Sequence, residues 1–99
     1  MLRPDVELAT YHGTHPAPRK PDCEPVTWYE STARAERVRV REHTCGCRNV
    51  VYELCAAAGV LFVRRLDRRD SPLTVRESHW LRTSEAERLW AAILDGRAR

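Results

Sequence analysis

Residues 49–66 read NVVYELCAAAGVLFVRRL, and this stretch decides the fold. Its first part alternates apolar and polar side chains and places Tyr52 and Leu54 on one face, as in a half-buried β-strand. Residues 60–63 are apolar at every position, which is typical of a central strand that is buried on both faces. Gly59 lies between the two parts and marks a turn. We therefore expect two adjacent antiparallel strands here.

The segments on either side extend this sheet. Residues 37–41 alternate Arg and Val strictly, so they predict a strand with Val38 and Val40 facing inward. A polar stretch at 67–72 precedes residues 73–77, where apolar and polar side chains alternate again. The simplest arrangement is an antiparallel meander of about four strands.

A helix is predicted at the end of the sequence. Ser84 to Glu87 have the form of a capping box, and Gly96 stands where a helix C-cap glycine belongs, so residues 85–95 should be helical. Apolar residues recur at helical spacing and form one stripe: Ala86, Leu89, Trp90 and Ile93. A sheet followed by a C-terminal helix makes the fold class α+β.

Residues 1–30 differ in composition, because five of the six prolines lie there. Proline lacks the backbone donor and resists both helix and central strand, so this segment is interpreted as an arm. Tyr11 and Trp28 give the arm apolar surface. We expect it to wrap the α+β domain, residues 31–99, or a second copy of that domain.

Composition limits the class of protein. Ninety-nine residues, 42% hydrophobic and 31% charged, suit one globular domain with a thin core. The sequence has no apolar run of 18 residues and no apolar signal core near its start, so neither membrane insertion nor secretion is indicated and a cytoplasmic protein is expected. The basic residues are almost all Arg, which is typical of a GC-rich genome. The net charge of +3 therefore says little about a nucleic-acid partner.

Four cysteines are many for a cytoplasmic chain of this length, where metal binding or reactive thiols are the usual reasons. The turn between two predicted strands holds Cys45 and Cys47, which can be aimed at one tetrahedral zinc ion. Cys55 is eight residues beyond Cys47, roughly 26 Å along a strand, and cannot reach the same ion. The candidate metal ligands are Cys23, His43, Cys45 and Cys47, with His12 or His15 as alternatives to His43. Unremarkable thiols, with Cys55 a small core residue, are the competing interpretation.

Catalysis is not indicated. The sequence has no nucleophile elbow, no phosphate-binding glycine loop and no paired carboxylates, so we expect a protein that is not an enzyme, although a Cys–His pair leaves a thiol enzyme or redox sensor open.

Basic residues of the middle segment either form a phosphate-binding face or lie on a solvated face of the sheet: Arg37, Arg39, Arg41, Arg48, Arg64, Arg65, Arg68 and Arg69. Direct binding to nucleic acid is the less favoured alternative.

One short helix over a thin sheet leaves apolar area to cover, and symmetric pairing is the common solution. A homodimer is therefore expected. The candidate interface residues are Tyr11, Trp28, Trp80, Leu89, Trp90 and Ile93.

Four stretches together resemble the BldB-like family of small actinomycete developmental regulators: Cys45–Arg48, Val51–Ala56, Gly59–Arg65 and Ser84–Trp90. The resemblance covers about residues 37–96. It implies a non-enzymatic regulator of transcription and development, needed for aerial growth, sporulation and antibiotic production, that self-associates and acts through a protein partner. Relatives are often encoded beside helix-turn-helix proteins, so the resemblance makes a DNA-binding partner plausible. It supplies no catalytic residue and no metal ligand; a zinc-stapled nucleic-acid-binding protein is the alternative function.

Overall fold

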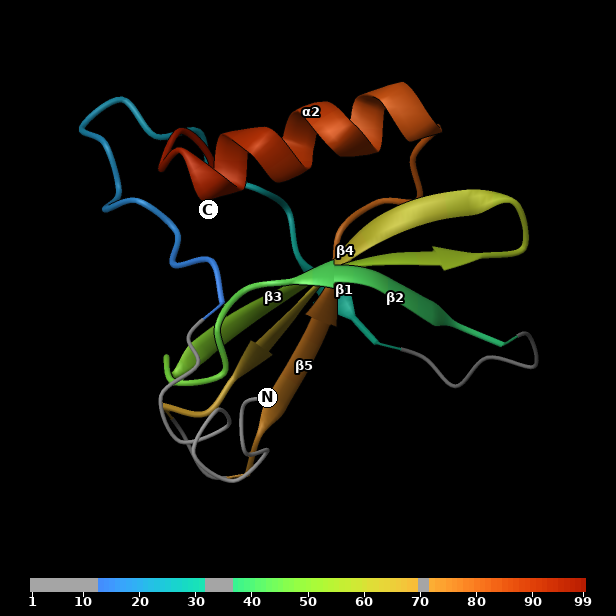
Figure 1. The fold of residues 1–99 in the computed structure, drawn as a ribbon, viewed down its shortest axis with the longest axis horizontal. Helices are drawn as coiled ribbons and strands as arrows, with labels where there is room; N and C mark the ends of the chain where they lie inside the picture. The colour runs from blue at the N-terminus through green and yellow to red at the C-terminus, as the bar shows by residue number, and fades with distance from the viewer. Residues whose placement is uncertain (1–12, 32–36, 70–71) are drawn as a thin grey trace, which may run out of the picture.

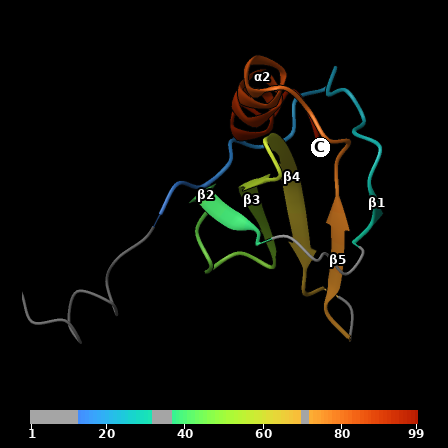
Figure 2. The ribbon, with the colours of Figure 1, turned by 90° about the vertical axis from the view of Figure 1, so that its right-hand side faces the viewer.

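The computed structural model describes residues 13–31, 37–69 and 72–99. They form an antiparallel sheet with a helix across one of its faces (Figures 1 and 2). The elements are β1 (Tyr29–Glu30), β2 (Arg39–His43), β3 (Val50–Ala57), β4 (Val60–Asp67), β5 (Thr74–Glu77) and α2 (Thr83–Leu94). The predicted α+β class, with an antiparallel sheet and a C-terminal helix, is confirmed.

The sheet has five strands in the order β1-β5-β4-β3-β2, rather than about four. Strands β2 to β5 form the predicted meander. The additional strand comes from the segment assigned to the arm, where Tyr29 pairs with Glu77 on β5. A strand of two residues is too short to show an alternating pattern in the sequence. It is a strand only because it pairs with β5.

Strands β3 and β4 form the hairpin expected from residues 49–66, with Leu54 opposite Val63. Ala58 and Gly59 make the turn with φ angles of +50° and +78°, the combination that matches the twist of the strands. Strand β4 is the middle strand of the sheet, and Phe62 and Val63 are fully buried on opposite faces.

The main core lies between α2 and one face of the sheet. It joins Tyr52, Leu54, Leu61 and Val63 of the sheet to Ala86, Trp90 and Ile93 of the helix. The helix begins at Thr83, two residues before the predicted start. The backbone N–H of Arg82 donates to Oε1 of Glu85 at 3.3 Å, so the cap lies upstream of the predicted Ser84–Glu87 box. Gly96 ends the helix with φ +78°, as expected for a glycine at this position.

The opposite face of the sheet has no helix over it among the described residues. Cys55, Ala57 and Phe62 are buried there, with Val38 packed against them. Val40 was expected to face inward, but it is 42% exposed because it lies on the edge strand β2, away from the core beneath α2.

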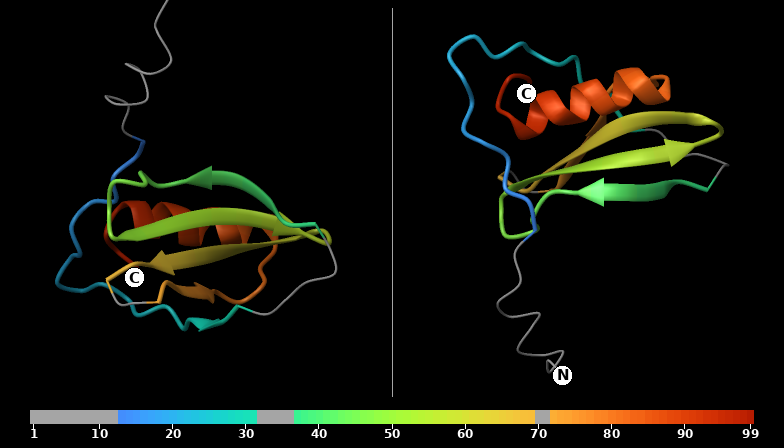
Figure 3. Two further views of the ribbon diagram at one scale, coloured as in Figure 1. Left: turned by 90° about the horizontal axis from the view of Figure 1, so that it is seen from below. Right: turned by 45° about the horizontal axis from the view of Figure 1, so that its top comes forward.

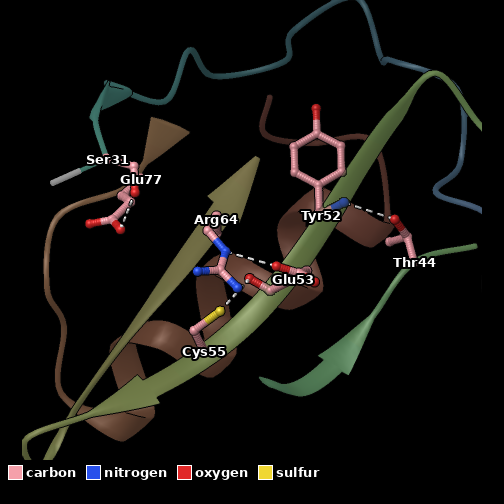
Figure 4. Close-up of polar contacts among 7 residues, drawn as sticks. All are labelled: Ser31, Thr44, Tyr52, Glu53, Cys55, Arg64 and Glu77. Atoms are coloured by element: carbon pink, nitrogen blue, oxygen red, sulfur yellow. Dashed lines mark hydrogen bonds and ion pairs between the residues drawn. The ribbon is translucent and has the colours of Figure 1, made fainter. Parts of the chain in front are cut away.

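A polar row crosses the same face. Nε of Arg64 donates to Oε1 of Glu53 across strands β3 and β4 at 2.8 Å, and Oγ of Ser31 donates to Glu77 on β5 at 2.9 Å (Figure 4). The register places Glu77 directly opposite Arg64. Charged side chains on this face therefore neutralise one another across the strands.

Residues 13–28 of the arm run around the C-terminal end of α2 (Figure 3). Backbone hydrogen bonds attach them there, from Ala17 N to Leu94 O at 2.8 Å and from Lys20 N to Gly96 O at 2.9 Å. Val26 N also donates to Arg99 O at 2.9 Å. Within the part of the chain that the structure describes, no helix has the length and apolar character that a membrane span needs.

Candidate metal centre

The arm meets the β2–β3 loop at two backbone positions. Thr14 forms a parallel bridge with Thr44, and the N–H of Cys45 donates to the carbonyl of Thr14 at 2.9 Å. Thr44 is fully buried, and its polar groups are paired with the backbone of Tyr52. The Thr44 N–H donates to Tyr52 O and the Thr44 hydroxyl accepts from Tyr52 N, both at 2.9 Å (Figure 4). The pairing of Thr14 with Thr44 places His15, the next residue of the arm, beside the loop.

Three ligand atoms meet at this junction. Nε2 of His15 lies 3.2 Å from Sγ of Cys47, and Sγ of Cys45 lies 3.3 Å from Sγ of Cys47. All three atoms lie within 4.8 Å of one another. Cys45 is buried, whereas His15 and Cys47 are exposed, so the group opens to solvent on one side.

The residue types and distances fit zinc. Thiolate and imidazole are the ligands that structural zinc prefers, with bonds of about 2.3 Å to sulfur and about 2.0 Å to nitrogen. Tetrahedral angles then require donor atoms roughly 3.5 to 3.8 Å apart. The Cys45–Cys47 and His15–Cys47 separations need to widen by only a few tenths of an ångström, and the third separation, between His15 and Cys45, lies within 4.8 Å and adjusts by side-chain rotation. Three protein ligands leave the fourth tetrahedral position for water or a further ligand.

The loop that carries both cysteines is held from the other side. The guanidinium of Arg68 donates to the carbonyl oxygens of Gly46 and Arg48, and the backbone N–H of Arg68 donates to Asn49 O at 2.8 Å. With Cys45 attached to the arm, the loop is fixed at both ends. The two thiols are therefore positioned before a metal arrives.

All three members of this group are among the residues that the sequence offered as ligands, His15 as an alternative to His43. Cys45 and Cys47 lie together as predicted, but Cys23 and His43 are not in the group. Cys23 lies further along the arm, where its neighbour Glu24 bridges Ala98, and Nδ1 of His43 is hydrogen-bonded to Thr44 O at 3.0 Å. His15 takes their place, as the Thr14–Thr44 pairing dictates.

His12 and Cys55 are not part of the group that the structure describes. His12, the second alternative to His43, lies outside the described residues. Cys55 is completely buried on the face of the sheet away from α2, where Figure 4 shows it beside Arg64. A role as a small core residue fits this position.

Cys47 has the electrostatics of a protonated thiol. Its pKa is raised, first by the hydrogen bond with Cys45 and next by desolvation, while nearby Arg48 acts in the opposite direction. A nucleophilic cysteine needs a lowered pKa, so the surroundings of Cys47 do not favour a thiol enzyme. A metal ion would displace the proton of this thiol, because cysteine binds metals as the thiolate.

The candidate interface residues are divided between core and surface. Trp90 and Ile93 are buried against the sheet, so they stabilise this chain rather than contact a partner. Trp28 and Leu89 pack at the edge of that core, and Trp80 is 52% exposed. Tyr11 lies outside the described residues.

The basic residues of the middle segment do not share one face. Arg64 and Arg65 are consecutive on β4, so their side chains leave opposite faces of the sheet. Arg64 pairs with Glu53, whereas the guanidinium of Arg65 lies 5.0 Å from the centre of the Trp28 ring on the α2 side. The single phosphate-binding face envisaged from the sequence is therefore not formed.

The chain matches no known family model, and no curated protein or solved structure matches it significantly.

Proposed function

We propose that this protein is a non-enzymatic binding module in which a zinc ion at His15, Cys45 and Cys47 fastens the arm to the sheet. The observation that carries the proposal is the convergence of three ligand atoms within 4.8 Å from two segments 30 residues apart in sequence. A thin core gains most from such a cross-link, because metal binding free energy becomes folding free energy.

A structural role for the metal is favoured over a catalytic one. The ligand group contains no carboxylate that could act as a general base. A water in the fourth position would lie at an open surface rather than in a closed, dry pocket, since His15 and Cys47 are both exposed. The ion would hold the arm in place without a reaction to perform.

The binding surface of the module is proposed to be the sheet face away from α2, together with edge strand β2. All five residues of β2 are exposed, and in the described residues the strand pairs only with β3. Val40 and Tyr29, each more than 40% exposed, add apolar area on this face. An unpaired strand edge of this kind suits association with a second copy, which supports a homodimer.

The regulatory part of the proposal rests on the BldB-like resemblance of residues 37–96. A homodimer of small interaction modules acts by binding, and a helix-turn-helix protein is the proposed partner. The expected consequence is a dimer that binds such a protein without contacting DNA itself.

Native mass spectrometry of protein purified without added metal or a metal-binding tag tests both parts of the proposal. We expect one zinc per chain and a dimer. His15→Ala and Cys47→Ser should each lose the zinc, whereas the matched controls His43→Ala and Cys23→Ser should retain it. Metal-free wild-type protein would overturn the zinc assignment, and loss of zinc in Cys23→Ser would replace the ligand set. A monomer would overturn the homodimer.

A further inference from the structure

Five arginines converge on one cavity beside the metal site. The cavity has a volume of about 420 Å³ and lies at the end of the sheet where the arm, the β2–β3 loop and residue 99 meet. Its charged lining comes from the arm, the β2–β3 loop, β4 with the turn after it, and residue 99: Arg19, Arg48, Arg65, Arg69 and Arg99. No acidic side chain of the described residues lines it.

Little of this positive charge is neutralised in the described contacts. Arg69 pairs with Asp67 at 2.7 Å, outside the lining of the cavity. Arg99 donates to three backbone carbonyl oxygens, one of them on Ala17 in the arm, and so is held rigidly without a carboxylate. Nε of Arg65 is buried and has no hydrogen-bond partner. Like charges gathered around one hollow repel each other, and a bound anion would relieve that repulsion.

Tyr52 adds an uncharged donor to the same lining. Burial raises the pKa of its hydroxyl, although the guanidinium groups of Arg99, Arg65 and other arginines act to lower it. The hydroxyl therefore keeps its proton at neutral pH and is available to donate a hydrogen bond to a ligand. Its ring points away from Glu53 and Arg64, which occupy the other face of the sheet (Figure 4).

We propose that this cavity binds a compact polyanion, a diphosphate or triphosphate group. Arginine binds phosphate oxygens through two parallel hydrogen bonds, and several guanidinium groups around one hollow suit several charges on one ligand. The volume lies in the range of small-molecule sites. The convergence on a single hollow, rather than a basic track along the surface, favours a small ligand over an extended nucleic-acid strand.

Isothermal titration calorimetry of the full chain tests this proposal with orthophosphate, pyrophosphate, tripolyphosphate and a nucleoside triphosphate. We expect tripolyphosphate to bind at least tenfold more tightly than orthophosphate. The double variant Arg19→Gln/Arg48→Gln removes two exposed guanidinium groups and should weaken tripolyphosphate binding by tenfold or more. Equal affinity for the nucleotide and tripolyphosphate identifies the phosphate chain as the whole determinant, and tighter binding of the nucleotide adds a contact with the nucleoside.

The matched control is Arg37→Gln/Arg88→Gln, which removes the same charge from exposed positions outside the cavity lining and outside β2. It should change the affinity by less than twofold, and circular dichroism should show both double variants folded. Equal losses of tripolyphosphate affinity in the two double variants would show that binding depends only on the overall positive charge, and would overturn the site. Absence of tripolyphosphate binding would also overturn it, as would tighter binding of single-stranded DNA through the same two arginines.

Discussion

Gly96 lies directly against Pro18, so that a β-carbon on Gly96 would overlap the Pro18 carbonyl oxygen and come within 3.0 Å of its carbon. Gly96 ends helix α2, and Pro18 belongs to the arm. The close approach lets Lys20 N reach Gly96 O at 2.9 Å. The glycine that ends the helix is therefore also a contact point for the arm.

Gly96→Ala should be more destabilising than Gly59→Ala. Both residues have φ +78°, which costs alanine about 1 kcal/mol, but a β-carbon at Gly59 meets only open space. The overlap at Gly96 should raise the total loss to about 3 kcal/mol. Urea unfolding of the two variants measures the difference, and equal losses would show that the arm does not lie against the helix end.

Removal of the metal should loosen the arm. Chelation is expected to increase tryptic cleavage after Arg19 several-fold and to lower the Tm by about 5 °C or more, because the cross-link to the loop is lost. His15→Ala should reproduce both effects without chelator. Cys23→Ser, a change in the same arm outside the ligand group, should behave as wild type. Unchanged cleavage after complete metal removal would contradict a stapling role.

Trp90→Ala should destabilise the protein by about 3 to 5 kcal/mol, since the side chain is 6% exposed and sits between α2 and the sheet. Trp80→Ala, at a side chain that is half exposed, should lose about 1 kcal/mol or less. Thermal unfolding followed by circular dichroism compares them. If the alanine variant of Trp90 does not fold, Trp90→Phe provides a measurable intermediate loss. A small effect at Trp90 would show that the core is misplaced.

Acid should remove a stabilising contribution from Asp67. Its pKa is lowered to about 2, first by the side chain of Arg69 and then by the Arg69 backbone N–H. The folded state therefore binds this proton less readily than the unfolded chain, whose pKa is near the ordinary value of 3.8. The contribution is complete above about pH 4 and disappears as the pH falls toward 2.

The size of this contribution is about 1 kcal/mol, because the Arg69 side chain is 63% exposed and the pair is screened by solvent. Urea unfolding of wild type and Asp67→Asn at pH 6 and pH 2.5 measures it. The stability difference between the two proteins should be smaller at the lower pH. A difference independent of pH would assign the interaction to hydrogen bonding alone.

The parts of the fold that the sequence predicted depend on neighbours along the chain. Alternation over residues 49–66 identified the β3–β4 hairpin because strand period and turn are both local. Strand β1 could not be predicted in this way, since Tyr29 pairs with Glu77 nearly fifty residues later. The helix start was displaced for the same reason: Leu61 and Leu81 bond to each other through their backbones, and the helix begins just after that bridge.

The candidate site divides along the same line. Cys45 and Cys47 are two residues apart in one loop, so their proximity is visible in the sequence. His15 was one of three histidines considered, and it joins the group because Thr14 pairs with Thr44, a contact that no spacing rule reveals. The basic residues were grouped by their position along the chain, although adjacent residues of a strand face opposite sides. Applying that rule to Arg64 and Arg65 would have separated them from the sequence alone.

The hydrogen bonds between the arm and residues 94–99 impose an order on biosynthesis. During translation, Ala17 leaves the ribosome long before its partner Arg99 has been made, with a delay on the order of ten seconds at ordinary elongation rates. Until then the proline-rich segment lacks the backbone partners that hold it against the helix end. Docking of the arm on the helix end therefore follows synthesis of residues 94–99, whereas the Thr14–Thr44 contact beside the β2–β3 loop needs only residues that are made earlier.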